Sequence, residues 1–408
     1  MGQFSLDPIA AVTHPDPYPY YAALTSSRPL YYDRARGLWV AASAETVTSV
    51  LTNELCRVRP PAEPVPRALL GSPAAEIFRH LVRMNDGGRH HELKRAILLA
   101  LSSVDQVQVA EETARWTRFH LDGLGPEDVL RRLSDFIFHL PVSVMGGLLG
   151  MPPTLLPQTA LWMSEFVRCL APASSSEQLE RGKLAAGQLF EMFQSLLIRG
   201  SAGGLLATLN RELGCPEPEE IAVVAANGIG FISQAYEATA GLIGNTLLAL
   251  VAYPEVRQQL RDDPALLRLA IPEVLRYDSP VQNTRRFLAR DGLVAGREMK
   301  GGEAILVLLA AANRDPAANP DPARFDLFRR ERRIFTFGLG AHACPGEMFA
   351  ATIAETVVRL LIGSGLDLDR LTATYRASAN LRIPLFTAPE SAGHRNQPGR
   401  SQNQEQKL

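Results

Sequence analysis

Cysteine is scarce in this sequence, and the four cysteines present, Cys56, Cys169, Cys215 and Cys344, are widely scattered. This distribution excludes a disulfide framework of the kind that holds small secreted domains together. It also lacks the paired cysteines, at ligand spacing, of a structural zinc site. We therefore expect a protein of a reducing compartment, the cytoplasm.

The sequence also lacks a strong excess of charge of either sign, because its formal net charge at pH 7 is −1. No global attraction to nucleic acid or to an anionic membrane is expected from it. The first residues, MGQFSLDPIAAVTHPDP, lack a basic flank followed by an apolar stretch, so neither a signal peptide nor a membrane anchor is predicted. Leu6 stands where a myristoylation motif beginning at Gly2 requires Ser or Thr.

What the chain does have is length and hydrophobic content: 408 residues, 46% of them hydrophobic, can bury a large core. Helical periodicity dominates 107–199, with interruptions near 146–153 and 171–176, and a long apolar run covers 219–253. Polar residues interrupt this run, which favours a buried central helix over a membrane span. Short strands are expected in 29–42 and 293–309. The chain is therefore predicted to be mainly α with a smaller β-rich part.

The stretch 335–349, FTFGLGAHACPGEMF, carries the strongest chemical signal. Cys344 lies in a glycine-rich loop that leads into a predicted helix, and a helix N-terminus favours an anionic thiolate able to bind a metal. The glycines let the backbone approach the sulfur, and Phe337 offers a flat apolar wall to a large planar cofactor. A buried free cysteine is the alternative, and His342 alone is too little for a zinc site.

The spacing Phe-Gly-x-Gly-x-His-x-Cys-x-Gly, from Phe337 to Gly346, resembles the haem-ligand loop of the cytochrome P450 family. The resemblance implies a cytochrome P450 fold, a triangular prism with a small β-rich part and a large helical part around buried haem b, protoporphyrin IX iron. It implies that Cys344 is the metal ligand and that Phe337, His342 and Gly346 bind the cofactor. It covers one domain, 1–388, and the polar stretch 389–408 is expected to be a disordered tail.

A second group of cofactor contacts is expected in 85–101, NDGGRHHELKRAILLAL, where a glycine turn enters an amphipathic helix. His90 and Lys94, four residues apart, can reach one anionic group together, although a solvated basic face is the alternative. The resemblance implies that both, with Arg286, hold the haem propionates. Lys94 departs from the arginine usual in the family and loses bidentate geometry. Arg285 leaves the register of Arg286 open by one residue.

Glu273 and Arg276 are three residues apart and so lie on one face of a helix, where they can form a charge-assisted pair. Alone, this spacing is weak evidence, because solvated helices contain it often. In the resembled family such a pair is completed by a further arginine upstream of the cysteine loop. The resemblance therefore implies a structural triad of Glu273, Arg276 and Arg324.

Within the long apolar run, QAYEATAGLIGN resembles the oxygen-activating segment of the family, and Glu237 takes the position of its catalytic acid. The usual threonine is replaced by Ala238, and Thr239 follows about 100° further around the helix. Ala238 cannot donate or accept a proton. A substrate hydroxyl or water replaces the alcohol, or peroxide supplies reduced oxygen, or the reaction is not ordinary hydroxylation. A structural role for Glu237 in a buried polar network is also open.

The resemblance implies a bacterial monooxygenase that oxidises a small organic, secondary-metabolite substrate, by hydroxylation or by coupling, cyclisation or nitration. Separate ferredoxin with its reductase, or flavodoxin, is expected to supply electrons to a monomer. A peroxide-using enzyme and a haem-binding protein without turnover are the alternatives. The substrate pocket is expected to include residues from the apolar run and from the segment after the triad: Ile232, Gln234, Ala235, Val281 and Asn283.

Overall fold

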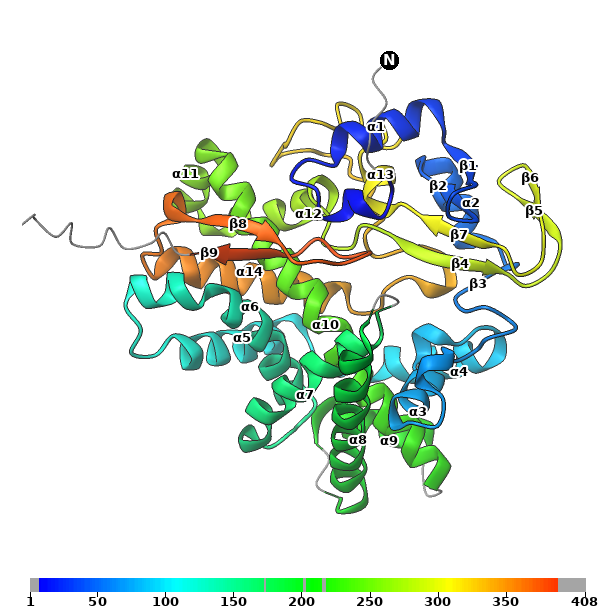
Figure 1. Ribbon diagram of the computed structural model, residues 1–408. Helices are drawn as coiled ribbons and strands as arrows, with labels where there is room; N and C mark the ends of the chain where they lie inside the picture. The colour runs from blue at the N-terminus through cyan, green and yellow to red at the C-terminus, as the bar shows by residue number, and fades with distance from the viewer. Residues whose placement is uncertain (1–6, 172–173, 201–202, 215–217, 388–408) are drawn as a thin grey trace, which may run out of the picture.

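A five-stranded sheet forms the β-rich part of the computed structural model, which describes residues 7–171, 174–200, 203–214 and 218–387 (Figure 1). Its strand order is β1-β2-β7-β4-β3. β1 and β2 pair antiparallel around a turn, which confirms the strands predicted in 29–42, whereas β7 runs parallel to β2. The strands are β1 Leu30–Asp33, β2 Leu38–Ala41, β3 Cys56–Arg57, β4 Thr284–Leu288 and β7 Ala304–Val307.

Two small hairpins complete the β structure. β5, Gly292–Val294, pairs with β6, Arg297–Met299, so the short strands predicted in 293–309 are confirmed. Nearer the C-terminus, β8, Thr372–Tyr375, pairs antiparallel with β9, Pro384–Thr387. The predicted tail, 389–408, lies outside the described residues.

Helices make up most of the remaining structure, as predicted. Side-chain caps fix several of their starts: Ser43 caps α2, and Asp105 and Ser175 form capping boxes that begin α5 and α8. The α-helices are α1 Tyr18–Ser27, α2 Ala44–Thr52, α3 Pro73–His80, α4 Gly87–Ser102, α5 Gln106–Leu121, α6 Pro126–Leu148, α7 Leu156–Cys169, α8 Ser176–Ile198, α9 Gly204–Leu213, α10 Pro218–Ala252, α11 Pro254–Asp262, α12 Leu267–Tyr277, α13 Leu309–Asn313 and α14 Glu347–Gly363.

The helical stretch 107–199 has one interruption more than the periodicity predicts. In addition to the two expected interruptions, α5 ends at Leu121 and α6 begins only at Pro126. Gly123 turns the chain between them with a φ of +70°, a conformation that glycine adopts without steric cost. Pro126 then occupies the first turn of α6, where a missing N–H leaves no hydrogen bond unmade.

Helix α10 is the central element of the molecule. It runs through the middle of the helical part in Figure 1 and packs against α6, α14, α3 and α8. Its residues Glu219–Ala252 are long and apolar enough to span a membrane, but 67% of the most apolar window is buried inside the protein. Burial on this scale is a property of a core helix. The structure therefore confirms the predicted central helix.

Helices α7 and α8 pack along each other, and α8 also contacts α3 and α10. The aromatic and methionine side chains of this pair face the core, as Met163, Phe166 and Phe193 have no accessible surface. The β8–β9 hairpin packs on another side of α10, where a Cβ on Gly244 would lie 3.0 Å from Pro384 Cδ. This close approach brings the hairpin loop, 376–383, to the middle of α10.

Candidate active site

The loop before α14 wraps closely around the Cys344 sulfur. The Gly338 N–H donates to the Phe335 carbonyl and the Cys344 N–H to the Phe337 carbonyl, each at 2.8 Å. The N–H of Gly346 points at the sulfur, with an N–Sγ distance of 3.4 Å. Gly338 has a φ of +69°, which explains the need for glycine at this turn. The thiol thus stands beside the start of α14, as the sequence predicts.

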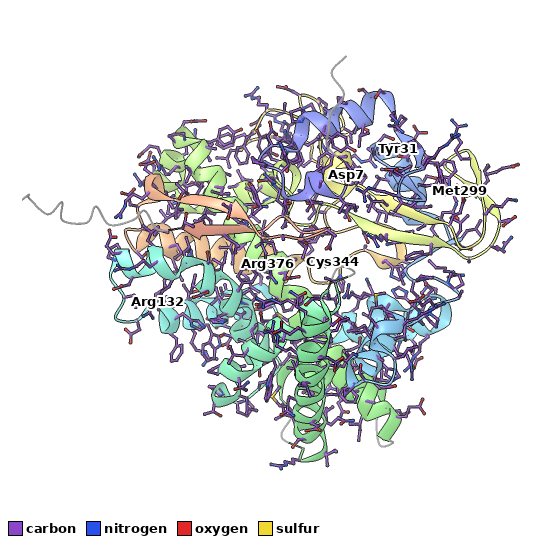
Figure 2. All side chains as sticks on the ribbon, in the orientation of Figure 1. Asp7, Tyr31, Arg132, Met299, Cys344 and Arg376 are labelled. Carbon is purple, nitrogen blue, oxygen red and sulfur yellow. The ribbon has the colours of Figure 1, made fainter. Side chains whose placement is uncertain are left out.

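Cys344 differs from the other described cysteines in its accessibility. Cys56 and Cys169 are buried, whereas Cys344 is exposed, although Figure 2 places it in the central part of the molecule. Burial raises the pKa of the Cys344 thiol, while the Gly346 N–H and the Lys94 ammonium favour the thiolate. Burial therefore favours the protonated thiol, and a bound metal cation would replace this proton.

Nitrogen donors gather around a single carboxylate next to this loop. His342 Nε2 lies 3.1 Å from Asp86 Oδ1, and the His90 and His342 rings are 4.2 Å apart between centroids. The Lys94 ammonium donates to the carbonyl of Ala343. Burial lowers the pKa of His90 to about 4 and also lowers that of Lys94. The structure thus brings His90, Lys94 and His342 together, and burial disfavours the charged forms of His90 and Lys94.

The register of the two adjacent arginines follows from β4. Successive side chains of a strand point to opposite faces, so Arg285 and Arg286 face opposite ways. Arg286 is only 6% exposed and interacts with the charge of Asp86, whereas Arg285 lies near Arg36. Burial lowers the pKa of Arg286. Arg286 is therefore the arginine that shares the surroundings of Asp86, in the register predicted.

The accessible face of α10 corrects one expected pocket residue. Phe231, Gln234, Ala235 and Ala238 are accessible and follow the i, i+3, i+4, i+7 spacing of one helix face, called the α10 stripe below. Ile232, one residue further around the helix than Phe231, has no accessible surface and belongs to the core. The prediction that Ile232 lines the pocket is wrong, and Phe231 occupies that face instead.

Thr239 also lies off the α10 stripe, with 1% of its surface exposed, as its 100° offset from Ala238 predicts. From the segment after the triad, Val281 is partly accessible and pairs with Leu381 of the hairpin loop. Asn283 is 2% exposed, and its side-chain amide donates to the Ala379 carbonyl at 2.9 Å. Asn283 therefore holds the hairpin loop in place, and its predicted position in the substrate pocket is wrong.

Glu237 is paired with an arginine that the sequence does not single out. Its Oε1 lies 3.0 Å from Nη1 of Arg376, in the hairpin loop, and both side chains are about one fifth exposed. The Arg376 guanidinium also lies over the Phe138 ring, 5.0 Å from its centroid. Burial raises the pKa of Glu237, against the lowering effect of Arg376, Arg168 and Arg83. Glu237 is thus an acid surrounded by positive charge.

Arg83 is the second residue that sequence reasoning missed. It lies in a short 3₁₀ turn, Val82–Met84, and its side chain is accessible even though burial lowers its pKa. The carboxylate of Glu237 is the charge that raises this pKa again. Within the described ranges Arg83 forms no hydrogen bond or ion pair. One available signal was a charged residue inside the apolar sequence LVRM.

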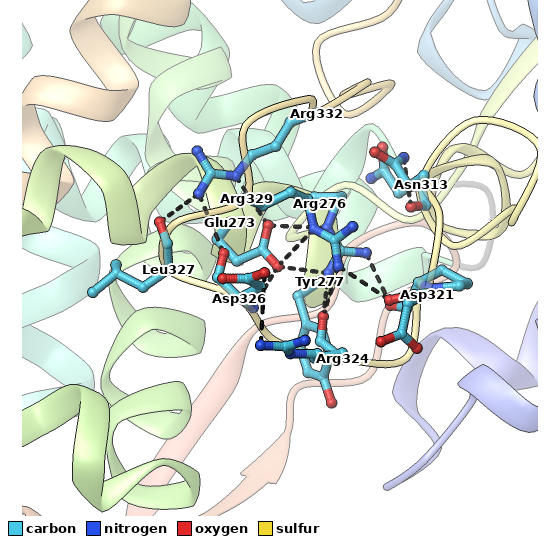
Figure 3. Close-up of polar contacts among 12 residues, drawn as sticks. Glu273, Arg276, Tyr277, Asn313, Asp321, Arg324, Asp326, Leu327, Arg329 and Arg332 are labelled. Atoms are coloured by element: carbon cyan, nitrogen blue, oxygen red, sulfur yellow. Dashed lines mark hydrogen bonds and ion pairs between the residues drawn. The ribbon is translucent and has the colours of Figure 1, made fainter.

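The predicted triad forms with different arginines. Glu273 and Arg276 pair at 2.7 Å and are both fully buried, as predicted. Arg329 and Arg332 add ion pairs to the Glu273 carboxylate at 3.4 and 3.0 Å (Figure 3). The Arg324 side chain is 67% exposed, and only its backbone carbonyl accepts a hydrogen bond from Arg276. The prediction for Arg324 is therefore wrong, because the chain turns its side chain to solvent.

These residues fit a haem group. The accessible sulfur of Cys344 would supply one thiolate ligand, and Phe337 remains partly accessible in the same loop. His90, Lys94, Arg286 and His342 would hold the two propionates, since among the described residues Asp86 is the carboxylate that acts on His90, Arg286 and His342. A bound anion would favour the charged forms of His90, Lys94 and Arg286, which burial disfavours.

Comparisons with known proteins identify the family. The family model "Cytochrome P450" matches residues 220–363. The "Putative cytochrome P450 140" of Mycobacterium tuberculosis is 30% identical over 419 residues, covering 95% of this chain and 91% of its own length. The "Vitamin D(3) 25-hydroxylase" of Pseudonocardia autotrophica is 32% identical over 286 residues, 66% of this chain and 67% of its own.

Solved structures show the same fold. CalO2 superimposes with a TM-score of 0.80 at 25% identity, over 93% of this chain and 97% of its own. P450BioI, solved in complex with an acyl carrier protein ligated to hexadec-9Z-enoic acid, has a TM-score of 0.77 at 25% identity, over 91% and 97% of the two chains. The predicted fold class is therefore confirmed.

Proposed function

This chain belongs to the cytochrome P450 family and is a haem b monooxygenase, and on that premise we propose that it oxidises a small secondary metabolite with Cys344 as the iron ligand. When bound, the haem supplies the oxidative chemistry, and the protein sets its ligand, access and proton supply. The observation that carries the proposal is the accessible yet desolvated thiol of Cys344, which receives the Gly346 N–H. Of the described cysteines, it alone can reach a ligand.

We propose that the α10 stripe and the Cys344 loop face one internal space, called the central space below. Packing of α10 against α14, the helix that follows the loop, supports this placement. Gln234, Ala235 and Ala238 are then the parts of α10 nearest the substrate, and Val281 contributes from the opposite segment. The missing hydroxyl at Ala238 leaves Glu237 as the acid that holds a proton beside this space.

The test is the reduced carbon-monoxide difference spectrum of purified wild-type and Cys344→Ser protein. We expect the band typical of thiolate-ligated haem in the wild type and its loss in the variant. Cys56→Ser is the matched control, because Cys56 is buried in the β-rich part and should leave the band unchanged. A thiolate band that persists in Cys344→Ser would contradict the assignment.

Ala238 favours a second candidate function, an enzyme that takes its oxygen from peroxide. A methyl group cannot help to move protons during dioxygen activation, whereas peroxide arrives already reduced. Ala238→Thr separates the two reactions. If dioxygen is the oxidant, the variant should change the yield of product per electron consumed with redox partners; if peroxide is, the peroxide-driven rate of the wild type should exceed the partner-driven rate. A haem-binding protein without turnover gives product by neither route.

The P450 family acts on small molecules and receives electrons from separate redox proteins. We propose ferredoxin with its reductase, or flavodoxin, as the electron donors of this chain, and a cytoplasmic monomer with a single domain over 1–388. Analogy with bacterial relatives supports the choice of substrate class: one is the 6-deoxyerythronolide B hydroxylase of Saccharopolyspora erythraea, 27% identical over 393 residues. Product analysis with reconstituted partners tests these points together.

A further inference from the structure

The pairing of Glu237 leaves an excess of positive charge beside the substrate space. Arg376 and Arg83 both interact with the Glu237 carboxylate, and among the described residues that carboxylate is the only negative charge that acts on Arg83. Arg168, the third arginine near Glu237, pairs with Glu165 at 3.5 Å; Arg181 shares Glu165 but also pairs with Glu177, so this group is balanced. Two guanidinium groups therefore share one carboxylate, which leaves one uncompensated positive charge. Such a charge in a desolvated place is costly unless an anion joins it.

The two arginines are also held where a ligand can reach them. The backbone N–H of Arg376 donates to the Ile383 carbonyl at 3.0 Å, and its guanidinium rests over the Phe138 ring. Arg83 is accessible, and the charge of the Glu237 carboxylate acts on its guanidinium. Asn283 fixes the hairpin loop that carries Arg376. A guanidinium presents paired N–H groups that match the two oxygens of a carboxylate.

We propose that the substrate carries a carboxylate that binds Arg376 and Arg83 and takes the place of Glu237 on Arg376. The inference deepens the proposed function and rests on it, because it takes the central space as the substrate site. Binding of this group neutralises the excess charge and frees the Glu237 side chain. The freed carboxylate can then hold and pass a proton in the place where Ala238 lacks a hydroxyl. The substrate anion thus both anchors the molecule and completes the proton path.

The experiment compares carboxylic acids with their primary amides on the haem-loaded protein. Benzoic, phenylacetic, decanoic and hexadecanoic acids and the four amides are titrated by calorimetry, with the haem spectrum recorded in parallel. We expect at least one acid to bind tenfold or more tighter than its amide. If no acid in the panel binds tighter than its amide, including the case in which nothing binds, the proposal is overturned.

Variants then show which residues cause the preference for acids over amides. Arg376→Gln and Arg83→Gln should each reduce the preference for the acid about tenfold, whereas Arg376→Lys should retain part of it and reports whether the fold survives the change. Glu237→Gln should tighten binding of the acid but not of the amide, because it removes the competing carboxylate. A purely structural role for the Glu237–Arg376 pair predicts no such gain. Arg79→Gln, an exposed arginine of α3 near Arg83, is the matched control.

The two levels of the proposal fail in different ways. If the wild-type protein shows no thiolate band, the haem assignment is overturned, whatever the calorimetry gives. A normal band with equal binding of acids and amides overturns only the carboxylate anchor. If Arg83→Gln loses haem while keeping its preference for acids, Arg83 binds a propionate and the two-arginine site is wrong.

Discussion

Replacement of Glu273 by Gln tests the buried charge cluster that fixes the segment leading to the cysteine loop. The Glu273 carboxylate is fully buried and is surrounded by Arg276, Arg329 and Arg332 at 2.7, 3.4 and 3.0 Å. Removing its charge leaves Arg276, also fully buried, without a counter-ion. Breaking a buried ion pair from one side costs about 3–5 kcal/mol, against a total stability of about 5–15 kcal/mol. We expect a large loss of folded, haem-loaded protein.

Two further variants make the prediction specific to the observed arrangement. Arg332→Gln removes the ion pair to Glu273 and the hydrogen bonds to the Asp326 and Leu327 carbonyls, at a site 13% exposed. It leaves Arg276 on Glu273 and should cost about 1.5–3 kcal/mol. Arg324→Gln alters a side chain that is 67% exposed and should cost no more than about 0.5 kcal/mol. Urea unfolding, followed by circular dichroism and by the haem band, measures the order. An Arg324→Gln loss as large as that of Glu273→Gln would refute the reasoning.

The same cluster predicts that the stability of the protein depends on pH. Burial disfavours the Glu273 carboxylate, but the bonds from Arg276, Arg332 and the Asp326 N–H outweigh it and lower its pKa. The unfolded chain therefore binds its proton at higher pH than the folded protein does, and stability falls as the pH drops from about 4.3 through the lower folded value. Wild-type protein should lose more stability over this window than Glu273→Gln. Equal losses would contradict the pKa direction.

Three other outcomes are expected. Lys94→Ala should speed haem loss about ten- to a hundredfold in a transfer assay, since one charge-assisted bond is worth about 1.5–3 kcal/mol. Arg95→Ala, at an exposed neighbour, should not change the rate. Phe231→Ala should change the binding of substrate-sized ligands with little change in stability. Ile232→Ala should leave ligand binding unchanged and lower the free energy of unfolding by about 2–5 kcal/mol, measured by urea unfolding. The free energy of unfolding of the haem-free protein should fall by up to about 3 kcal/mol between about pH 6.5 and pH 4. The reason is that the pKa of His90 is lowered to about 4 in the folded protein, so only the unfolded chain binds this proton in that range. His90→Phe should abolish the loss.

Contiguous patterns predicted the conformation of the Cys344 loop and the central helix correctly. The Cys344 loop needs only neighbours in sequence: glycines at the turns, and a helix that starts three residues after Cys344. The central helix follows from a long apolar run between two prolines. In both cases the physical cause lies within one segment, so the sequence contains it.

Tertiary packing decided the features that were wrong or missed. Ile232 and Phe231 are both apolar neighbours on one helix, and only the packing of α10 tells which of them is accessible. Arg324 and Arg329 are both arginines in one irregular segment, whose path places Arg329 on Glu273. Arg376 meets Glu237 from a hairpin 139 residues further along the chain, and no local pattern pairs such distant groups.

The missing hydroxyl at Ala238 and the ion pair of Glu237 both bear on how protons are supplied beside the substrate. An acid held by Arg376 is a poor proton donor, because the guanidinium favours its carboxylate form and occupies one of its oxygens. Burial acts in the opposite direction and raises the pKa of Glu237 despite this arginine. A ligand that draws Arg376 away removes one of the opposing charges and raises the pKa further, so that Glu237 holds a proton ready for transfer. Proton supply in this protein would then follow substrate binding, without a hydroxyl on α10.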